Sequence, residues 1–441
     1  MKPFETINLD AYLDERPAEG VIRVDRSIFT DPAIFELEME RIWERSWLYV
    51  CHESQIPNAG DFLTTYLARQ PVIVMRGASG QVNVFINACS HRGSQLIHEE
   101  RGNKTDLTCF FHGWCFDTDG RLMSVTREKG GGYPDQFCKE KYPLTRVPRV
   151  ESYRGFVFAS LSDEVPTLAE HLRDARVMID MMADQGGDAG LEVLRGHSTY
   201  TYDGNWKLQA ENGVDGYHVH GLHVNFALTT QNRERIRAGQ NQIKSMDVSQ
   251  LGNLEAGFFD FGNGHVVLWG DWPNRGDRRP NFHMYDEWSR KFGEVYANWM
   301  IGKLRNTLIY PNVFLMDQMS SQIRVFRPIA VDKTEVTIYA IAPKGEPPAM
   351  RAHRIRQYED FFNASGMATP DDLAEFGYAQ HAYQGRLARW NDLTRGVKFL
   401  TKGPDARAKA LGINPEYCGG KVEDEGIFLA QHRHWLRAMQ K

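Results

Sequence analysis

The chain has 441 residues, of which 42% are hydrophobic and 25% charged, so it has the composition of a globular protein long enough for two domains. Its 52 Lys and Arg residues nearly balance its 57 Asp and Glu residues, and no basic block stands out, which argues against nucleic acid and for a small-molecule ligand. The N-terminal residues hold no apolar core of a signal peptide, and no run of about 18 apolar residues occurs, so we expect a cytoplasmic enzyme.

The first part of the chain predicts one helix followed by short antiparallel strands. Apolar residues recur with helical spacing between Ile34 and Trp43, which is typical of an amphipathic helix. Three β-rich runs bounded by turn residues, 62–67, 72–75 and 82–86, then predict the hairpins of a small antiparallel domain, and a strand at 155–161 is expected to complete it.

The second part predicts a larger domain. A helix over 165–182 and a glycine-rich hinge at 186–190 precede a strand at 198–202, whereas residues 226–290 show no periodicity and are expected to be irregular. Three strands and two helices then follow: 308–316, 322–326 and 335–342 for the strands, 350–363 for one helix, and a second helix that starts at Thr369 with Pro370 in its first turn.

Two mixed Cys/His motifs lie in the predicted β-domain, Cys89-x-His91 and Cys109-x2-His112-Gly-Trp. Thiolate is a softer ligand than imidazole, so two such loops suit two metals of different preference better than one. A Rieske [2Fe-2S] centre uses this set, because two His replace two Cys on one of its irons. A single structural zinc site uses the same residue types, but zinc fingers usually pair Cys with Cys and His with His.

A second cluster lies about a hundred residues further on, where residues 205–223 contain three His and two acidic residues. His218 and His223 are separated by about 500° of rotation on a regular helix, so they converge only if the helix loosens, for example at Gly221. Asp215, three residues before His218, shares its face and can orient its imidazole. Two imidazoles with one carboxylate form the facial site of non-haem Fe(II) oxygenases, although two His at this spacing are also common in ordinary helices.

The carboxylate of such a site must come from elsewhere in the chain. Asp317, Asp360, Asp371 and Asp372 are all candidates, and spacing does not choose among them. Asp371 and Asp372 also have a purely structural interpretation, because acidic residues in the first turn of a helix favour its N-terminal dipole.

Together the two clusters resemble the large (α) subunits of Rieske non-haem iron ring-hydroxylating oxygenases. The resemblance rests on the Cys/His loops, on Asn-Trp-Lys and Glu-Asn in residues 205–212, and on Asp215-x2-His218-x4-His223. Segments such as 52–57, 320–324 and 354–372 are similar to the benzoate and anthranilate 1,2-dioxygenase branch of this family.

The resemblance implies a role for each residue of the two clusters. Cys89 and Cys109 would hold one iron of the cluster, and His91 and His112 the other. The mononuclear iron would be bound by His218, His223 and Asp372. Asp215 would connect His218 to His112 of a neighbouring subunit and so carry electrons between chains. Asn212 matches a polar residue near the iron. The roles implied therefore fall on these residues: Cys89, His91, Cys109, His112, Asn212, Asp215, His218, His223 and Asp372.

The implied fold is α+β, with an N-terminal helical segment (1–45) that packs on the catalytic domain, a Rieske antiparallel β-domain (46–165) and a helix-grip catalytic domain with an antiparallel sheet (166–441). The implied enzyme uses O2 and NADH-derived electrons to dihydroxylate benzoate, anthranilate or a related arene to a cis-dihydrodiol or catechol. Electrons would come from a separate NADH-dependent reductase, with or without a ferredoxin, because the chain has no G-x-G-x-x-G fingerprint. The resemblance also implies a small β subunit and a trimer of αβ pairs.

Three other functions stay open on the sequence alone: an aniline-type (aromatic amine) dioxygenase, a salicylate-type ring monohydroxylase, and an electron-transfer Rieske protein without oxygenase activity. His220 lies between the two predicted ligands, but on a helix its side chain points away from that of His218, so we do not expect it to bind iron. Val214, beside Asp215, is a candidate for shaping the substrate pocket, and the sequence does not decide its role.

Overall fold

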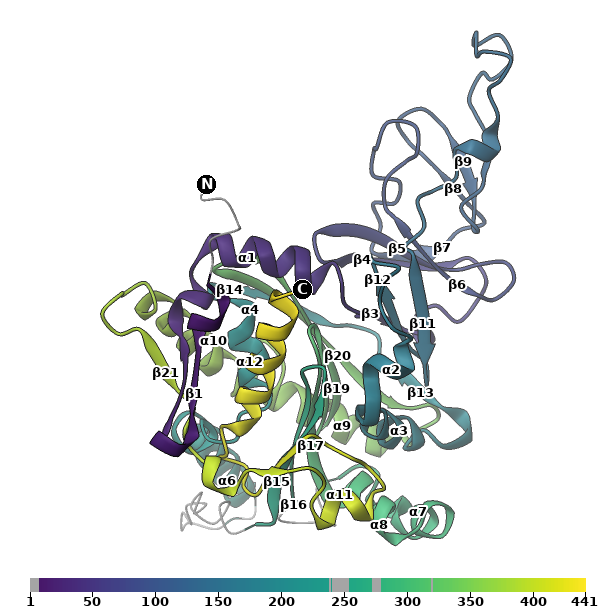
Figure 1. The fold of residues 1–441 in the computed structure, drawn as a ribbon. Coiled ribbons are helices and arrows are strands. Elements are labelled where there is room, and N and C mark those ends of the chain that lie inside the picture. The colour runs from purple at the N-terminus through teal and green to yellow at the C-terminus, as the bar shows by residue number, and fades with distance from the viewer. Residues whose placement is uncertain (1–7, 238, 240–253, 272–278, 319) are drawn as a thin grey trace. The chain divides into compact units, whose positions relative to one another are not determined.

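The structure, a computed structural model, describes residues 8–237, 239, 254–271, 279–318 and 320–441 (Figure 1). The chain divides into two compact units, of which one is Trp43–His171 and the other combines Met1–Ile42 with Leu172–Lys441. No helix of the described residues is long and apolar enough to cross a membrane.

Short antiparallel sheets build the unit Trp43–His171. One sheet has the strand order β6-β5-β4-β7 and contains the predicted hairpins, and two three-stranded sheets have the orders β10-β9-β8 and β11-β12-β3. Phe62, Phe85 and Phe116 are fully buried in its core, which also encloses Cys89 and Cys109. The strands are β3 Leu48–His52, β4 Asp61–Leu67, β5 Gln70–Arg76, β6 Val82–Ile86, β7 Arg101–Asn103, β8 Asp106–Thr108, β9 Cys115–Asp117, β10 Leu122–Ser124, β11 Arg149–Tyr153 and β12 Phe156–Ser160.

A ten-stranded antiparallel sheet forms the centre of the other unit. Its order is β13-β20-β19-β18-β17-β16-β15-β23-β22, and β14 also pairs with β20; a small separate sheet has the order β1-β2-β21. The strands are β1 Leu13–Arg16, β2 Val21–Asp25, β13 Leu191–Val193, β14 Ser198–Tyr202, β15 Ala256–Gly262, β16 His265–Asp271, β17 Lys303–Ile309, β18 Val313–Asp317, β19 Ser321–Ala330, β20 Lys333–Pro343, β21 Trp390–Asp392, β22 Thr401–Lys402 and β23 Tyr417–Gly419.

The helices largely confirm the periodic patterns of the sequence. The predicted helix at 34–43 is α1 followed by a π-helical turn, Met39–Trp43, and the one at 350–363 is α9. The helices are α1 Pro32–Glu38, α2 Leu168–Leu172, α3 Arg176–Asp184, α4 Trp206–Asn212, α5 Val219–Leu222, α6 Val224–Arg237, α7 Tyr285–Phe292, α8 Glu294–Ala297, α9 Pro348–Phe361, α10 Thr369–Ala382, α11 Ala406–Ala410 and α12 Gly426–Met439.

Two expectations for this unit are wrong. Residues 226–290, expected to be irregular, include most of α6, the β15–β16 hairpin and the start of α7, although 238, 240–253 and 272–278 lie outside the described residues. The hairpin turns at Asn263-Gly264, where both residues have positive φ as a tight turn requires. The run 308–316 is not one strand, because the chain turns at 310–312 between β17 and β18.

α4, which carries the first part of the His-rich segment, is held at its N-terminal end by a buried carboxylate. Asn205 accepts a hydrogen bond from the Lys207 N–H and caps the helix. Glu38, at the end of α1 and fully buried, forms an ion pair with Lys207 and accepts hydrogen bonds from the indoles of Trp206 (2.8 Å) and Trp435 of α12 (2.7 Å). Glu38 thus ties α1 and α12, which lie far apart in the sequence, to α4 (Figure 1).

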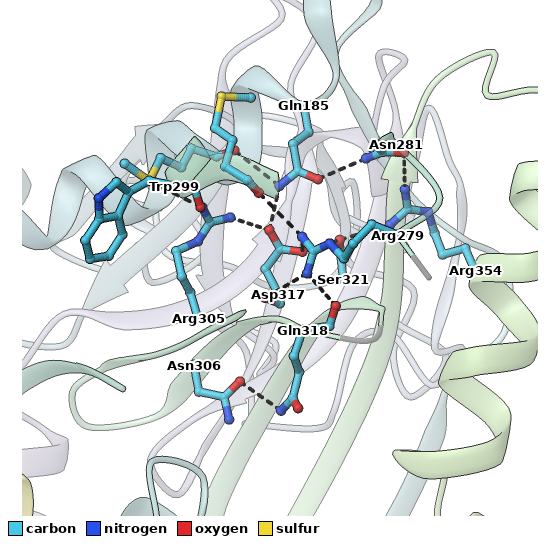
Figure 2. Close-up of polar contacts among 12 residues, drawn as sticks. Gln185, Arg279, Asn281, Trp299, Arg305, Asn306, Asp317, Gln318, Ser321 and Arg354 are labelled. Atoms are coloured by element: carbon cyan, nitrogen blue, oxygen red, sulfur yellow. Dashed lines mark hydrogen bonds and ion pairs between the residues drawn. The ribbon is translucent and has the colours of Figure 1, made fainter. Parts of the chain in front are cut away.

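A second buried network surrounds Asp317 at the end of β18 (Figure 2). Its carboxylate pairs with Arg279 (2.9 Å) and with Arg305, and it accepts hydrogen bonds from Gln185 (2.6 Å) and Ser321 (3.0 Å). Burial acts to raise the pKa of Asp317, but the two guanidinium groups outweigh burial and lower that pKa. Asp317 therefore stays ionised and joins α3 to two strands of the sheet.

We expect Asp317→Asn to lower the free energy of unfolding by about 3–5 kcal/mol, because it leaves two buried arginines without a full counter-charge. Asp188→Asn is the matched control: Asp188 is exposed and pairs with the half-exposed Lys291 at 3.3 Å, so its loss should cost less than about 1 kcal/mol. Denaturant unfolding followed by circular dichroism measures both. Equal losses in the two variants would contradict a structural role for the network.

Candidate active site

The chain leaves helical geometry twice between Asn212 and Val224, and this brings two histidines together. α4 ends at Asn212, and α5 is a single turn that ends at Leu222. His223 has φ −98° and ψ 13°, outside helical values, before α6 begins at Val224. The loosening expected at Gly221 therefore occurs two residues later, and Gly221 itself lies inside α5.

Asp215 fixes the turn between α4 and α5 and orients His218. Its Oδ1 accepts hydrogen bonds from the backbone N–H of Tyr217 (2.6 Å) and of His218 (3.3 Å), and its Oδ2 lies 3.1 Å from His218 Nδ1. Burial acts to lower the pKa of His218, but the carboxylates of Asp215 and Asp372 outweigh burial and raise it. Because Nδ1 faces Asp215, Nε2 is the nitrogen that can bind a metal.

Three potential ligand atoms lie close together on the Nε2 side of the His218 ring. His218 Nε2 lies 3.1 Å from His223 Nε2 and 3.5 Å from Asp372 Oδ1, and His223 Nε2 lies 3.3 Å from the same oxygen. Among the described residues, His218, His223 and Asp372 form the group whose arrangement could hold a metal ion. Bonds of about 2.1 Å to a first-row metal at right angles place neighbouring ligands about 3.0 Å apart, so these spacings fit three ligands on one face of an ion.

The structure distinguishes Asp372 from the three other carboxylates that the sequence offered as metal ligands. Asp317 is held by Arg279 and Arg305, and Asp360 pairs with Arg356 at 2.8 Å on the surface. Asp371 and Asp372 both lie in the first turn of α10, but only Asp372 is buried. Neither acts as a cap, because α10 begins at Thr369 after Ala368 and its start has no side-chain cap hydrogen bond.

The two Cys/His loops of the other unit have matching backbone geometry. The N–H of Gly93 donates to the carbonyl of Cys89, and the N–H of Gly113 donates to that of Cys109, both at 2.9 Å. Both glycines have φ near +70°, a conformation that glycine adopts readily. A glycine four residues after each cysteine is a signal that the Cys/His spacing alone did not use.

Within these loops the thiols and the imidazoles gather in separate layers. Cys89 and Cys109 are buried, and burial raises the pKa of Cys89, an effect that the neighbouring Cys109 thiol increases. The rings of His91 and His112 lie nearer the surface with their centroids 4.6 Å apart, and Trp114 stacks on His91. A buried thiol pair beneath an outer imidazole pair fits a cluster with two differently ligated irons.

Comparisons with known proteins identify both parts of the chain. A family model described as the Rieske [2Fe-2S] domain matches residues 46–148, and one described as the ring hydroxylating alpha subunit (catalytic domain) matches residues 191–387. The chain is 49% identical over 436 residues to toluate 1,2-dioxygenase subunit alpha of Pseudomonas putida, an alignment that covers 98% of this chain and 94% of that protein. The chain belongs to the ring-hydroxylating dioxygenase α subunits.

Two further similarities refine this membership. The α subunit is 46% identical over 432 residues to the anthranilate 1,2-dioxygenase large subunit of Acinetobacter baylyi, covering 96% of this chain and 91% of that one, which confirms the benzoate/anthranilate branch. A solved structure of naphthalene 1,2-dioxygenase with indole bound matches with a TM-score of 0.84 at 26% identity, covering 99% of this chain and 95% of that chain. The predicted fold, a Rieske β-domain with a helix-grip catalytic domain, is thereby confirmed.

As a member of this family, the α subunit is an aromatic-ring-hydroxylating dioxygenase component. Its cofactors are a Rieske [2Fe-2S] cluster and a mononuclear iron, and NADH supplies electrons through a reductase. Family members are oxygenase components that work with a reductase and often with a β subunit.

Other side chains surround the three ligand atoms, and of these the resemblance implies only Asn212. The Asn212 side-chain amide lies 3.2 Å from Asp372 Oδ1 and 3.5 Å from His218 Nε2, and the Phe361 ring packs on His223 with centroids 5.5 Å apart. Val214 is fully buried.

Two carboxylate–imidazole pairs lie beside these ligands. His220 lies 3.2 Å from Glu423, and Glu211 lies 2.7 Å from His432 of α12. These partners are about two hundred residues apart in the sequence, so no local pattern connects them.

Proposed function

We propose that His218, His223 and Asp372 bind the mononuclear iron of this oxygenase, and that Cys89, Cys109, His91 and His112 bind the Rieske cluster. The observation that carries the proposal is the meeting of His218 Nε2, His223 Nε2 and Asp372 Oδ1 at separations of 3.1–3.5 Å. When bound, the iron supplies dioxygen activation, and the cluster supplies an electron that a single Fe(II) lacks.

The residues around these ligands hold them in place. Asp215 keeps a proton on His218 Nδ1, so that the Nε2 lone pair faces the metal position. Asn212 donates to Asp372 Oδ1 and limits rotation of that carboxylate. Both contacts reduce the freedom of the ligands before any metal binds.

We propose that Asp215 also receives electrons from the cluster of a neighbouring copy, through that copy's His112. The Asp215 side chain is 23% exposed, so another molecule can reach it while it stays against His218. His91 and His112 lie near the surface of their unit, which favours contact with a neighbouring chain. Such an exchange requires an assembly, and we propose a trimer of α subunits, each paired with a small β subunit, in the cytoplasm with a separate NADH-dependent reductase.

For the substrate we propose an aromatic carboxylate of the benzoate or anthranilate type, which becomes a cis-dihydrodiol or a catechol. Support comes from the identity of 49% and 46% to α subunits named for toluate and anthranilate.

The proposed substrate predicts a ranking among arenes. In turnover assays with the reductase, benzoate or anthranilate should give product, whereas aniline, which lacks the acid group, should give little. Product analysis by mass spectrometry measures this. A preference for aniline, with ammonia release, would move the enzyme to aromatic amines, and a singly hydroxylated product from salicylate would make it a monohydroxylase.

A further inference from the structure

Arg324 of β19 is a buried cation that forms no ion pair with any of the described residues. Only 4% of Arg324 is exposed. Its Nε is buried and has no hydrogen-bond partner in the described part of the chain. The Phe362 ring lies beside it, with its centroid 5.8 Å from the guanidinium carbon. Burying an unpaired charge is costly, so this arrangement calls for an anion.

The other deeply buried arginines of the same sheet region are paired. Arg279 and Arg305 share Asp317, and Arg354 lies 2.7 Å from Glu346 (Figure 2 shows the Asp317 pairs). Carboxylates therefore pair with these guanidinium groups, whereas in the described part of the chain no carboxylate pairs with Arg324.

The strand register places Arg324 on the face of the sheet that carries α4. Arg324 pairs with Phe314 of β18, and directly paired side chains of antiparallel strands point to the same face. Gly213, at the end of α4, packs directly on the Phe314 ring: a Cβ added to Gly213 would lie 2.3 Å from a ring atom of Phe314. Arg324 thus shares this face with the segment that ends in Asn212, beside the three ligand atoms.

Two neighbours connect Arg324 to the ligand atoms more directly. Phe362, beside its guanidinium, follows Phe361, which packs on His223. Tyr200 of β14 has a buried hydroxyl without a partner among the described residues. Tyr200 pairs with Val336 of β20, and Arg324 pairs with Ile338, two residues further along the same strand, so both side chains lie on the same face of the sheet. Burial raises the pKa of Tyr200, so its hydroxyl keeps its proton and can donate it in a hydrogen bond.

We propose that Arg324 binds the carboxylate of an aromatic acid, with the Tyr200 hydroxyl as a second donor, and so selects arene carboxylates over neutral arenes. This inference rests on the proposed function, and it names the residue that recognises the acid group. The planar guanidinium offers paired N–H donors that match a carboxylate. Because Arg324 shares its face of the sheet with the end of α4, an acid group bound there leaves the ring on the face where Asn212 meets Asp372.

The test uses the iron-loaded α subunit in its native assembly, with benzoate and its neutral analogue benzamide as probes. Calorimetry should show that the wild type binds benzoate more tightly than benzamide. Arg324→Gln should weaken benzoate binding about 10- to 100-fold, leave benzamide binding within about threefold, and retain its iron. Arg324→Lys, which keeps the charge, should recover part of the loss.

Arg327→Gln is the matched control, because Arg327 lies on the same strand but pairs with Glu335 at 2.7 Å and is partly exposed. It should bind benzoate like the wild type. The inference fails if Arg324→Gln binds benzoate normally, or if it loses benzoate and benzamide equally, as a merely structural residue would. Wild-type turnover of neutral arenes without benzoate binding would overturn the Arg324 role and leave the oxygenase proposal intact. An iron-loaded enzyme that binds benzoate but oxidises no arene would overturn the proposed function instead.

Discussion

Replacing Asp372 by Ala should empty the mononuclear iron site and leave the Rieske cluster in place. Asp372 Oδ1 lies within 3.5 Å of both imidazole nitrogens and is the carboxylate of the set, so its loss leaves two neutral ligands for a divalent ion. We expect iron beyond that of the cluster to fall at least about tenfold, with turnover falling in parallel. Iron and sulfide analysis per chain, combined with the visible spectrum of the cluster, measures this.

Asp371→Ala is the control for this prediction. Asp371 shares the first turn of α10 but is not buried with the imidazoles and caps no backbone N–H, so its loss should remove only a dipole interaction of about 0.3–1 kcal/mol. Both metal centres should remain. Loss of iron in Asp371→Ala with normal iron in Asp372→Ala would show that the carboxylate ligand is assigned to the wrong member of the pair.

Replacing Asp215 by Asn should retain both metal centres yet reduce turnover about a hundredfold or more. Asn keeps a side-chain oxygen for the N–H of Tyr217, so the turn before α5 should survive, but it removes the charge beside His218 Nδ1. A purely orienting carboxylate would show its loss mainly as weaker iron binding, by about 10- to 100-fold. If Asp215 instead carries electrons, its loss should slow the oxidation of the reduced Rieske cluster.

Stopped-flow absorbance of the reduced cluster, mixed with oxygen and substrate, separates the two roles of Asp215. Glu423→Gln is the matched control, because Glu423 forms another carboxylate–imidazole pair, with His220, and should leave cluster oxidation unchanged. Wild-type oxidation rates in Asp215→Asn would contradict the electron path. Equal slowing in both variants would point to a general disturbance of this region.

Local sequence patterns predict those parts of the structure that depend on residues close together in the chain. The Cys/His loops, the hairpins around them and the pairing of Asp215 with His218 all depend on residues within one turn or one hairpin. The position of the helix break was predicted two residues too early. The existence of the break follows from the angle between His218 and His223 on a regular helix, but this angle does not determine which residue leaves helical geometry.

Contacts between distant segments were beyond these patterns. Four carboxylates had suitable spacing, and only packing distinguishes Asp372 from Asp317, which two arginines neutralise. The 308–316 run contains Pro311-Asn312, which are turn residues at the place where the chain turns between β17 and β18, and Asn263-Gly264 is a hairpin signal of the same kind. The apolar residues on both sides of Pro311-Asn312 are what make the run resemble a single strand. In the sequence Arg324 is one charged residue of a predicted strand. Only the structure shows that it is buried and that none of the described residues pairs with it.

The most direct test of the account is a single turnover of the reduced, iron-loaded protein with benzoate or anthranilate under 18O-labelled dioxygen, followed by mass spectrometry of the product. We expect a diol acid from benzoate, or a catechol from anthranilate, that carries two labelled atoms from one dioxygen molecule. A product with a single label would contradict dioxygenation, and an unchanged substrate with a reoxidised cluster would contradict the proposed substrate class.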